Sequence, residues 1–163
     1  MENNHRMNQN KEGKNRYTKF ILMLLGSFIA MYITMYFNTY AIDHVCFSLT
    51  RVYMACLGIS AMAVIMLLFM ISMYKNKKKN IAILMGSLVL FVSALTLVRT
   101  QTPIDDVLYM KAMIPHHSIA ILTSKRADIK DPEVRKLADA IIKAQEKEIA
   151  EMKAYIKRLQ SDK

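Results

Sequence analysis

The sequence predicts an all-α protein in which three transmembrane helices precede a two-helix hairpin outside the cell membrane. Hydrophobic residues make up 53% of the 163 residues, and many of them stand in three long uncharged runs. Only 4 Gly and 3 Pro interrupt the chain, which disfavours a β-sandwich with its many turns. The 2 Cys are too few for a disulfide framework or a four-cysteine zinc site.

The three uncharged runs cover residues 20–37, 52–74 and 81–98. Because a helix rises about 1.5 Å per residue, each run can cross a hydrocarbon core about 30 Å thick. A small soluble domain would have to hide three helices that lack a polar face, so membrane spans are the better interpretation. The first run is followed by no small-residue cleavage site, which favours an uncleaved anchor over a signal peptide.

Basic residues predict the topology of these spans. The basic tail 1–19 contains five Lys or Arg, the loop 75–79 contains four, and the loop 38–51 contains Arg51 alone. By the positive-inside rule the tail and the loop 75–79 are cytoplasmic, so residues 100–163 lie outside the membrane of a bacterial cell. The net charge of +10 is therefore concentrated beside the spans, and the predicted partner is the lipid bilayer rather than nucleic acid.

The polar segment 100–163 predicts two antiparallel helices. Thr102-Pro103 supplies a cap and a first-turn proline for a helix that ends near Ala127, and Asp131-Pro132 does the same for a helix that ends near Leu159. Each helix carries a row of residues at steps of three and four. The rows are Asp106, Met110, Met113, His117 and Ala120, and Val134, Ala138, Ile141, Gln145, Glu148, Met152, Tyr155 and Leu159.

Both rows are polar at their centres, which predicts a binding site there because an unpaired buried polar group costs about 1–3 kcal/mol. Thioether sulfur suits Cu(I) and imidazole accepts several metals, so the mixed set favours a copper ion, Cu(I) above all. Pro115 is expected to kink the first helix and turn His116 toward this site. The predicted metal residues are Met110, Met113, His116, His117, Gln145, Glu148 and Met152. The competing interpretation is methionine as core filler beside a surface histidine pair.

A wider pattern resembles a known bacterial family, the domain of unknown function 305 (DUF305), over about residues 104–156. The matching residues are Asp106, Tyr109, Met113 to His117, Leu137-Ala138, Ile141-Ile142, Gln145, Glu148-Ile149 and Met152. The membrane half is similar to multi-spanning members through Met35-Tyr36, Asp43-His44-Val45 and Arg51. The resemblance implies a ferritin-like fold, a role in copper tolerance, and metal contacts at Met113, His116, His117, Glu148 and Met152.

A ferritin-like bundle has four helices, whereas this segment supplies two. A lone hairpin rarely buries enough apolar surface to be stable. We therefore expect either that two copies pair their hairpins, as a homo-oligomer, or that the hairpin docks on the outer ends of the spans.

Further metal candidates lie outside the hairpin, at His44 and Cys46 in the outer loop and at Met62 and Met66 in the second span. Cys46 could instead form a disulfide with Cys56. Met62, Met66, Met70 and Met73 predict a row on one helical face. That row is similar to the copper uptake channels of the Ctr family, although the predicted topology and the third span differ. Gap filling by flexible methionine is the favoured interpretation of the row.

The sequence contains no nucleophile–base pair, phosphate-binding loop or repeated Glu-x-x-His motif, so we predict a non-enzymatic protein. The first hypothesis is a membrane-anchored protein that binds and buffers copper outside the cell membrane, with a copper-handling protein as a further partner. The alternatives are a Cu(I) transporter subunit and a structural anchor whose hairpin recruits a partner without metal.

Overall fold

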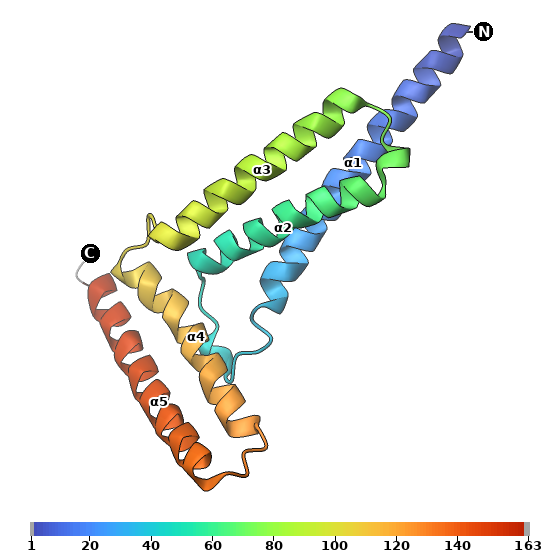
Figure 1. Ribbon diagram of the computed structural model, residues 1–163. Coiled ribbons are helices and arrows are strands. Elements are labelled where there is room, and N and C mark those ends of the chain that lie inside the picture. Colours follow the sequence, from blue (N-terminus) through green and yellow to red (C-terminus); the bar gives the residue numbers. More distant parts are fainter. Residues whose placement is uncertain (1, 162–163) are drawn as a thin grey trace. The chain divides into compact units, whose positions relative to one another are not determined.

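The computed structural model describes residues 2–161, with side chains from Asn15 onward, and this part of the chain is all-α (Figure 1). It is 83% helical. The α-helices are α1 (Glu2–Thr34), α2 (Leu49–Phe69), α3 (Lys77–Thr100), α4 (Asp106–Arg126) and α5 (Pro132–Ser161), with 3-10 turns η1 (Ile42–His44) and η2 (Ile71–Met73). The chain divides into a span unit, residues up to 32 with 52–100, and a hairpin unit, residues 33–51 with those from 101 onward.

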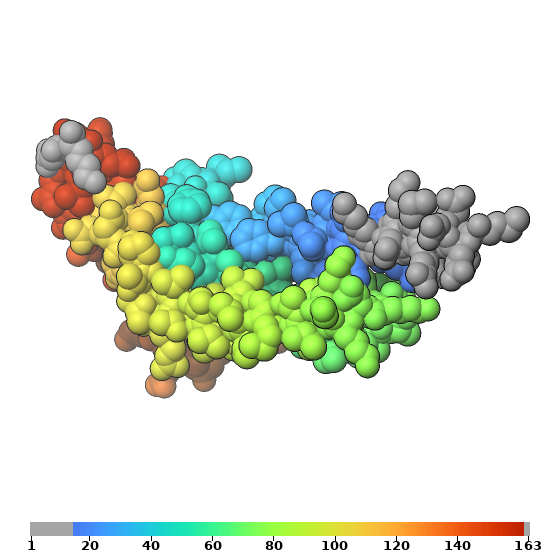
Figure 2. Space-filling model, turned by 90° about the horizontal axis from the view of Figure 1, so that it is seen from above, coloured from blue at the N-terminus to red at the C-terminus, as the bar shows by residue number. Residues whose placement is uncertain are grey.

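The span unit contains three helical segments that are long and apolar enough to cross a membrane: Asn15–Thr34, Leu49–Phe69 and Lys77–Thr100. This finding confirms the three predicted apolar helices and is compatible with membrane association. About 33% of the most apolar stretch of α2 is buried, against 11% for each of the other two helices. Side chains of α3 lie uncovered along the face shown in Figure 2.

Two of the helices end before the apolar runs do. α1 ends at Thr34 and not at Phe37, and α2 ends at Phe69 and not at Tyr74. The first helix stops where the Arg51 guanidinium donates to the Met35 carbonyl and stacks 4.2 Å from the centre of the Tyr36 ring. Since the carbonyls in the last turn of a helix lack partners within it, a cation there stabilises the helix end.

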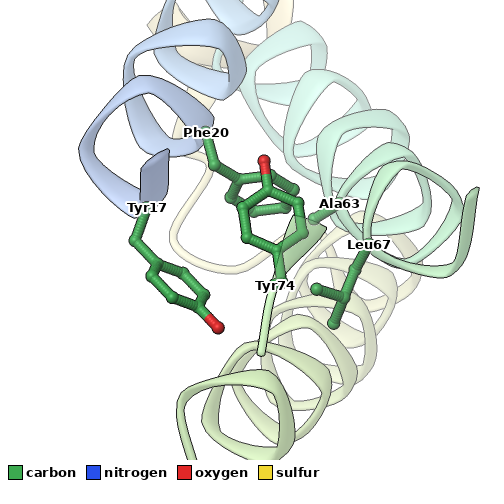
Figure 3. Packing of buried hydrophobic residues seen from close by; sticks show 5 residues of the cluster. All are labelled: Tyr17, Phe20, Ala63, Leu67 and Tyr74. Carbon is green, nitrogen blue, oxygen red and sulfur yellow. The ribbon is translucent and has the colours of Figure 1, made fainter. Parts of the chain in front are cut away.

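The second helix stops early because Tyr74 turns back into an aromatic cluster (Figure 3). Tyr17 and Phe20 of α1 pack with Ala63 and Leu67 of α2, and all five side chains are buried. The ring of Tyr74 lies 5.0 Å from that of Tyr17 and meets Phe20 edge-on at 5.5 Å. Such aromatic pairs add about 0.5–1.5 kcal/mol to the stabilisation from burial. They therefore favour a turn after Phe69 over continuation of α2.

In the hairpin unit α4 and α5 pack side by side and antiparallel, as predicted (Figure 1). Asp131 caps α5 as expected, accepting from the amides of Glu133 at 2.9 Å and Val134 at 3.0 Å. The predicted cap of α4 is wrong: Asp105, not Thr102, accepts from the Leu108 amide at 2.8 Å. A carboxylate is a strong N-cap and also interacts favourably with the helix dipole.

The observed buried row of α5 shares Ala138, Gln145, Met152 and Leu159 with the predicted row, and the other four predicted members are exposed. Val134, Ile141 and Tyr155 are 50%, 36% and 48% exposed. The side chains that are buried or partly buried instead follow the row Arg135, Ala138, Ile142, Gln145, Ile149, Met152, Ile156 and Leu159. On α4 the buried set is Met110, Ile114, Pro115, Ser118 and Ile121, while Asp106 is exposed.

The loop 38–51, which the sequence predicts as the outer loop and which keeps that name here, packs on the hairpin as a third layer. The Tyr40 amide donates to the Ser118 hydroxyl at 2.7 Å, and Lys153 pairs with Asp43 at 2.7 Å. Cys46 packs with Met152 and Ile156 against the buried cluster of Ile114, Ile121 and Ile149. Because α4 has neighbours on two sides, its buried face is wider than a two-helix seam predicts.

Candidate metal centre

His117 on α4 and Glu148 on α5 form the polar centre of the hairpin. His117 Nε2 lies 2.8 Å from Glu148 Oε2, and its Nδ1 lies 3.0 Å from the backbone carbonyl of Met113 one turn earlier. The imidazole is 13% exposed and the carboxylate 48%. The pair joins the two helices at the edge of the buried core.

The two contacts of the ring assign its nitrogens. A carbonyl oxygen can only accept, so Nδ1 carries a hydrogen and donates to Met113. Nε2 is then the nitrogen that faces the carboxylate, as donor when the ring is protonated and as a free lone pair when it is neutral. A ring held at Nδ1 by a carbonyl, with Nε2 directed at the site, is the arrangement found in histidines that bind metals.

Gln145 supports the carboxylate. Its side-chain Nε2 donates to Glu148 Oε2 over 3.4 Å, from one turn earlier on α5. Gln145 is partly buried and Glu148 is exposed. The Gln145 amide therefore contacts the carboxylate of Glu148.

The predicted methionines lie along the same two helices. Met110 is buried, and Met113 is partly buried one turn before His117. Met152 is one turn after Glu148 and packs against the isoleucine cluster. Residues three and four apart share a helical face, so these thioethers stand in the same strip of each helix as the imidazole and the carboxylate.

His116 lies at the margin of this arrangement. The helix continues through buried Pro115, and the His116 side chain is exposed, contrary to the expected rotation toward the site. Its ring centre is 6.0 Å from that of His117, in an edge-on arrangement. His116 is thus beside the pair but on the solvent side of it.

The donor set limits which metal can fit. Within residues 2–161 no group of three or more His, Cys, Asp and Glu side chains is placed to hold a metal ion. A closed tetrahedral zinc site, which needs four such donors, does not fit His117 and Glu148 alone. The flanking methionines add thioether sulfur, which is a ligand type that soft ions accept.

The outer-loop candidates belong to the hairpin unit. His44 Nδ1 lies 3.0 Å from the Ser118 hydroxyl, and Asp43 Oδ1 lies 3.9 Å from the other ring nitrogen. Burial lowers the pKa of His44 and Lys153 lowers it further, against a smaller opposing effect of Asp43, so the neutral ring is favoured. Burial likewise raises the pKa of the Cys46 thiol. Cys46 and Cys56 are both free, so the disulfide considered above is not formed.

Ser118 is the residue of this region that the sequence did not single out. It is completely buried and contacts both Tyr40 and His44. A signal was present, because a helix turns about 100° per residue and Ser118 directly follows His117. Because His117 faces α5, Ser118 must face another side of α4. A small polar residue on that side indicates that another segment packs there.

The two methionines of the second span belong to the other unit. Met62 is 37% exposed, and Met66 packs with Met70 against the aromatic cluster of Figure 3. The predicted row of four is wrong, since α2 ends at Phe69 and Met73 lies 45% exposed in η2. Gap filling accounts for Met66 and Met70.

Comparison with known proteins identifies the domain. The family described as "Domain of unknown function (DUF305)" matches residues 93–163. "Uncharacterized protein L153" of Acanthamoeba polyphaga mimivirus is 36% identical over 139 residues, which cover 83% of this chain and 90% of that protein. The chain belongs to the DUF305 family. The likeness to the viral relative extends beyond the DUF305 domain into the apolar helices, while no solved structure matches the chain.

The family match confirms the resemblance that the hairpin residues suggested, since the DUF305 domain contains α4, α5 and the His117–Glu148 pair. The relative is from a virus, so a bacterial origin stays a prediction.

Proposed function

We propose that this DUF305 protein is a membrane-anchored copper-binding protein that holds Cu(I) in its hairpin, outside the cell membrane, and buffers it. The observation that carries the proposal is the fixed ring of His117, which directs Nε2 at Glu148 between helical strips that carry Met110, Met113 and Met152. The imidazole and the thioethers would bind the ion, and Glu148 would bind it or neutralise its charge. Binding rather than catalysis is the proposed activity.

The membrane part of the proposal is supported by the three apolar helices and by the charge next to them. The loop 75–79 is rich in Lys, and the loop 38–51 contains one Asp and one Arg. The positive-inside rule then puts the hairpin outside the cell membrane. Reporter fusions at Lys77 and at the C-terminus test this topology, and a cytoplasmic C-terminus would contradict it.

The hairpin leaves one long edge for a second copy of the chain. On one edge of α5, Lys153 pairs with Asp43 of the outer loop, and Glu146 pairs with Lys125, which also reaches Tyr40 of that loop. Glu148 lies about 200° round the helix from Glu146. The other edge carries apolar side chains that are 36–60% exposed: Tyr109, Val134, Leu137, Ile141 and Tyr155. Two copies that cover these residues would form a ferritin-like four-helix bundle, and burying such side chains favours association.

Titration of the full chain in detergent with Cu(I), against a chromophoric chelator under reducing conditions, tests the copper site. We expect His117→Ala to weaken Cu(I) binding at least tenfold and Glu148→Gln to weaken it by about 10–100-fold. Met113→Leu with Met152→Leu should also weaken it, because leucine keeps the volume and removes the sulfur. Met85→Leu is the matched control, since Met85 is 55% exposed on α3. Unchanged affinity in His117→Ala would overturn the proposal.

A further inference from the structure

The span unit holds basic side chains from two distant segments at one end. Lys19 and Arg16 belong to α1, and four lysines follow η2 sixty residues later. Those four are Lys75, which precedes α3, and Lys77, Lys78 and Lys79, which begin it. Between residues 13 and 104 the sequence contains one acidic residue, Asp43, and it belongs to the hairpin unit. Among residues 15–32 and 52–100 the span unit therefore contains no carboxylate that could pair with these four lysines.

Buried hydrogen bonds fix the two segments to each other. The Tyr17 hydroxyl donates to Asn80 Oδ1 at 2.7 Å, and the side-chain nitrogen Nδ2 of Asn80 donates to the Tyr74 carbonyl at 2.7 Å. Arg16 reaches the Met73 carbonyl at 3.4 Å. With the rings of Tyr17, Phe20 and Tyr74 packed as in Figure 3, the connection between α2 and α3 is attached to α1.

The lysines are placed where their charge is least favourable without an anion. Lys77, Lys78 and Lys79 form the first turn of α3, which contains no acidic residue, and Asn76 Oδ1 accepts from the Lys79 amide at 3.0 Å. The start of a helix carries a partial positive charge, so cations there repel it. Lys79 Nζ also lies 4.9 Å from the centre of the Tyr17 ring, which keeps this charge beside the aromatic cluster.

We propose that these basic residues bind the phosphate headgroup of an anionic phospholipid in the leaflet at this end of the spans. The cations stand at the ends of apolar helices, where headgroups lie in a bilayer, and tyrosine is enriched at that depth. Each Lys or Arg close to an anionic surface adds to the attraction, so a fixed cluster of several selects anionic over zwitterionic lipid. The inference rests on the proposed membrane anchoring and not on the copper site.

The test measures the apparent Kd of individual lipids for the full chain by native mass spectrometry from detergent micelles. The probes are dioleoylphosphatidylglycerol and dioleoylphosphatidylcholine. We expect the wild type to prefer the anionic lipid, and Lys77→Gln/Lys78→Gln/Lys79→Gln to bind it about 10–100-fold more weakly with little change for the zwitterionic one. Lys136→Gln/Lys143→Gln/Lys157→Gln is the matched control, because it removes the same charge from exposed positions on α5.

Three results would overturn the inference. The first is wild-type affinity in the first triple variant, and the second is an equal loss in the control, which would show a response to net charge alone. The third is displacement of the lipid by millimolar inorganic phosphate, which would indicate a site for the free anion. Cu(I) affinity measured on the same triple variant should be unchanged, so a failure of this site and a failure of the copper site are distinguishable.

Discussion

The span unit and the hairpin unit are both helical, but different forces determine their packing. In the span unit most apolar side chains are exposed, and the buried cluster of Tyr17, Phe20, Ala63, Leu67 and Tyr74 lies at one end. In the hairpin unit buried isoleucines of α4 and α5 pack together, and most charged side chains of both helices are exposed. Rotation of an apolar span about its axis changes little, whereas rotation of α5 exchanges buried and exposed residues.

This difference explains why the sequence predicts the two units unequally well. Length and hydropathy are local properties, so they identify the three apolar helices without knowledge of any contact. α5 offers two rows with steps of three and four, which share every second member and differ by one residue at the others, as at Ile141 and Ile142. Local periodicity cannot choose between them.

The strongest test of this comparison replaces one isoleucine in each row. Ile149→Ala removes a side chain that is 3% exposed, so we expect a loss of about 2–5 kcal/mol in the free energy of unfolding of the hairpin unit. Ile141→Ala, at 36% exposure on the same helix, should cost less than about 1 kcal/mol in a single copy. Chemical denaturation followed by circular dichroism measures both. A larger loss for Ile141 would restore the predicted row and reject the observed one.

The candidate site shows the same division between local and distant information. His117, Gln145 and Glu148 can be found from the sequence because each stands at helical spacing within its own segment. The contact of His44 with Ser118 joins residues 74 positions apart. Helical spacing within one segment cannot predict such a pair. His44 and Cys46 attract attention as metal-binding residue types, but their place on the hairpin depends on how the outer loop folds back.

In the span unit the corresponding test removes a single oxygen. Tyr17→Phe keeps the aromatic packing of Figure 3 and leaves Asn80 Oδ1 without its 2.7 Å partner. An unpaired buried acceptor costs about 1–3 kcal/mol, so we expect a lower midpoint of thermal unfolding in detergent. Equal midpoints for wild type and Tyr17→Phe would show that the aromatic rings alone fix the α2–α3 connection.

Acidification should loosen the outer loop from the hairpin and leave the span unit unchanged. The pKa of folded His44 lies below its ordinary value of 6.5, chiefly through burial and then through Lys153, so the unfolded loop binds a proton more readily. The stability that the neutral ring contributes is therefore complete above about pH 6.5 and is lost as the pH falls through the folded pKa.

Hydrogen exchange of the Tyr40 amide, which donates to Ser118, measures this release. Protection corrected for the intrinsic exchange rate should fall between pH 7.5 and 5.5 in the wild type and change less in His44→Gln, which cannot gain the proton. Asp43 does not produce a change in this range, because its hydrogen bond from Lys153 lowers its pKa from the ordinary 3.8. Identical pH profiles for both chains would contradict a role for His44.

The smallest expected effect concerns the close approach of α1 and α2 inside the span unit. A Cβ at Gly58 would lie 2.8 Å from Met31 Sδ and 3.0 Å from its Cε, whereas a Cβ at Gly26 would meet nothing within 4 Å. Alanine favours a helix by about 1 kcal/mol over glycine, so Gly26→Ala should stabilise the unit by up to that amount. At Gly58 the flexible end of the methionine must move, which offsets the gain and predicts a change close to zero. Thermal unfolding of both variants in the same detergent measures the difference. A Gly58→Ala chain as stable as Gly26→Ala would mean that the contact with Met31 does not hold the two helices together.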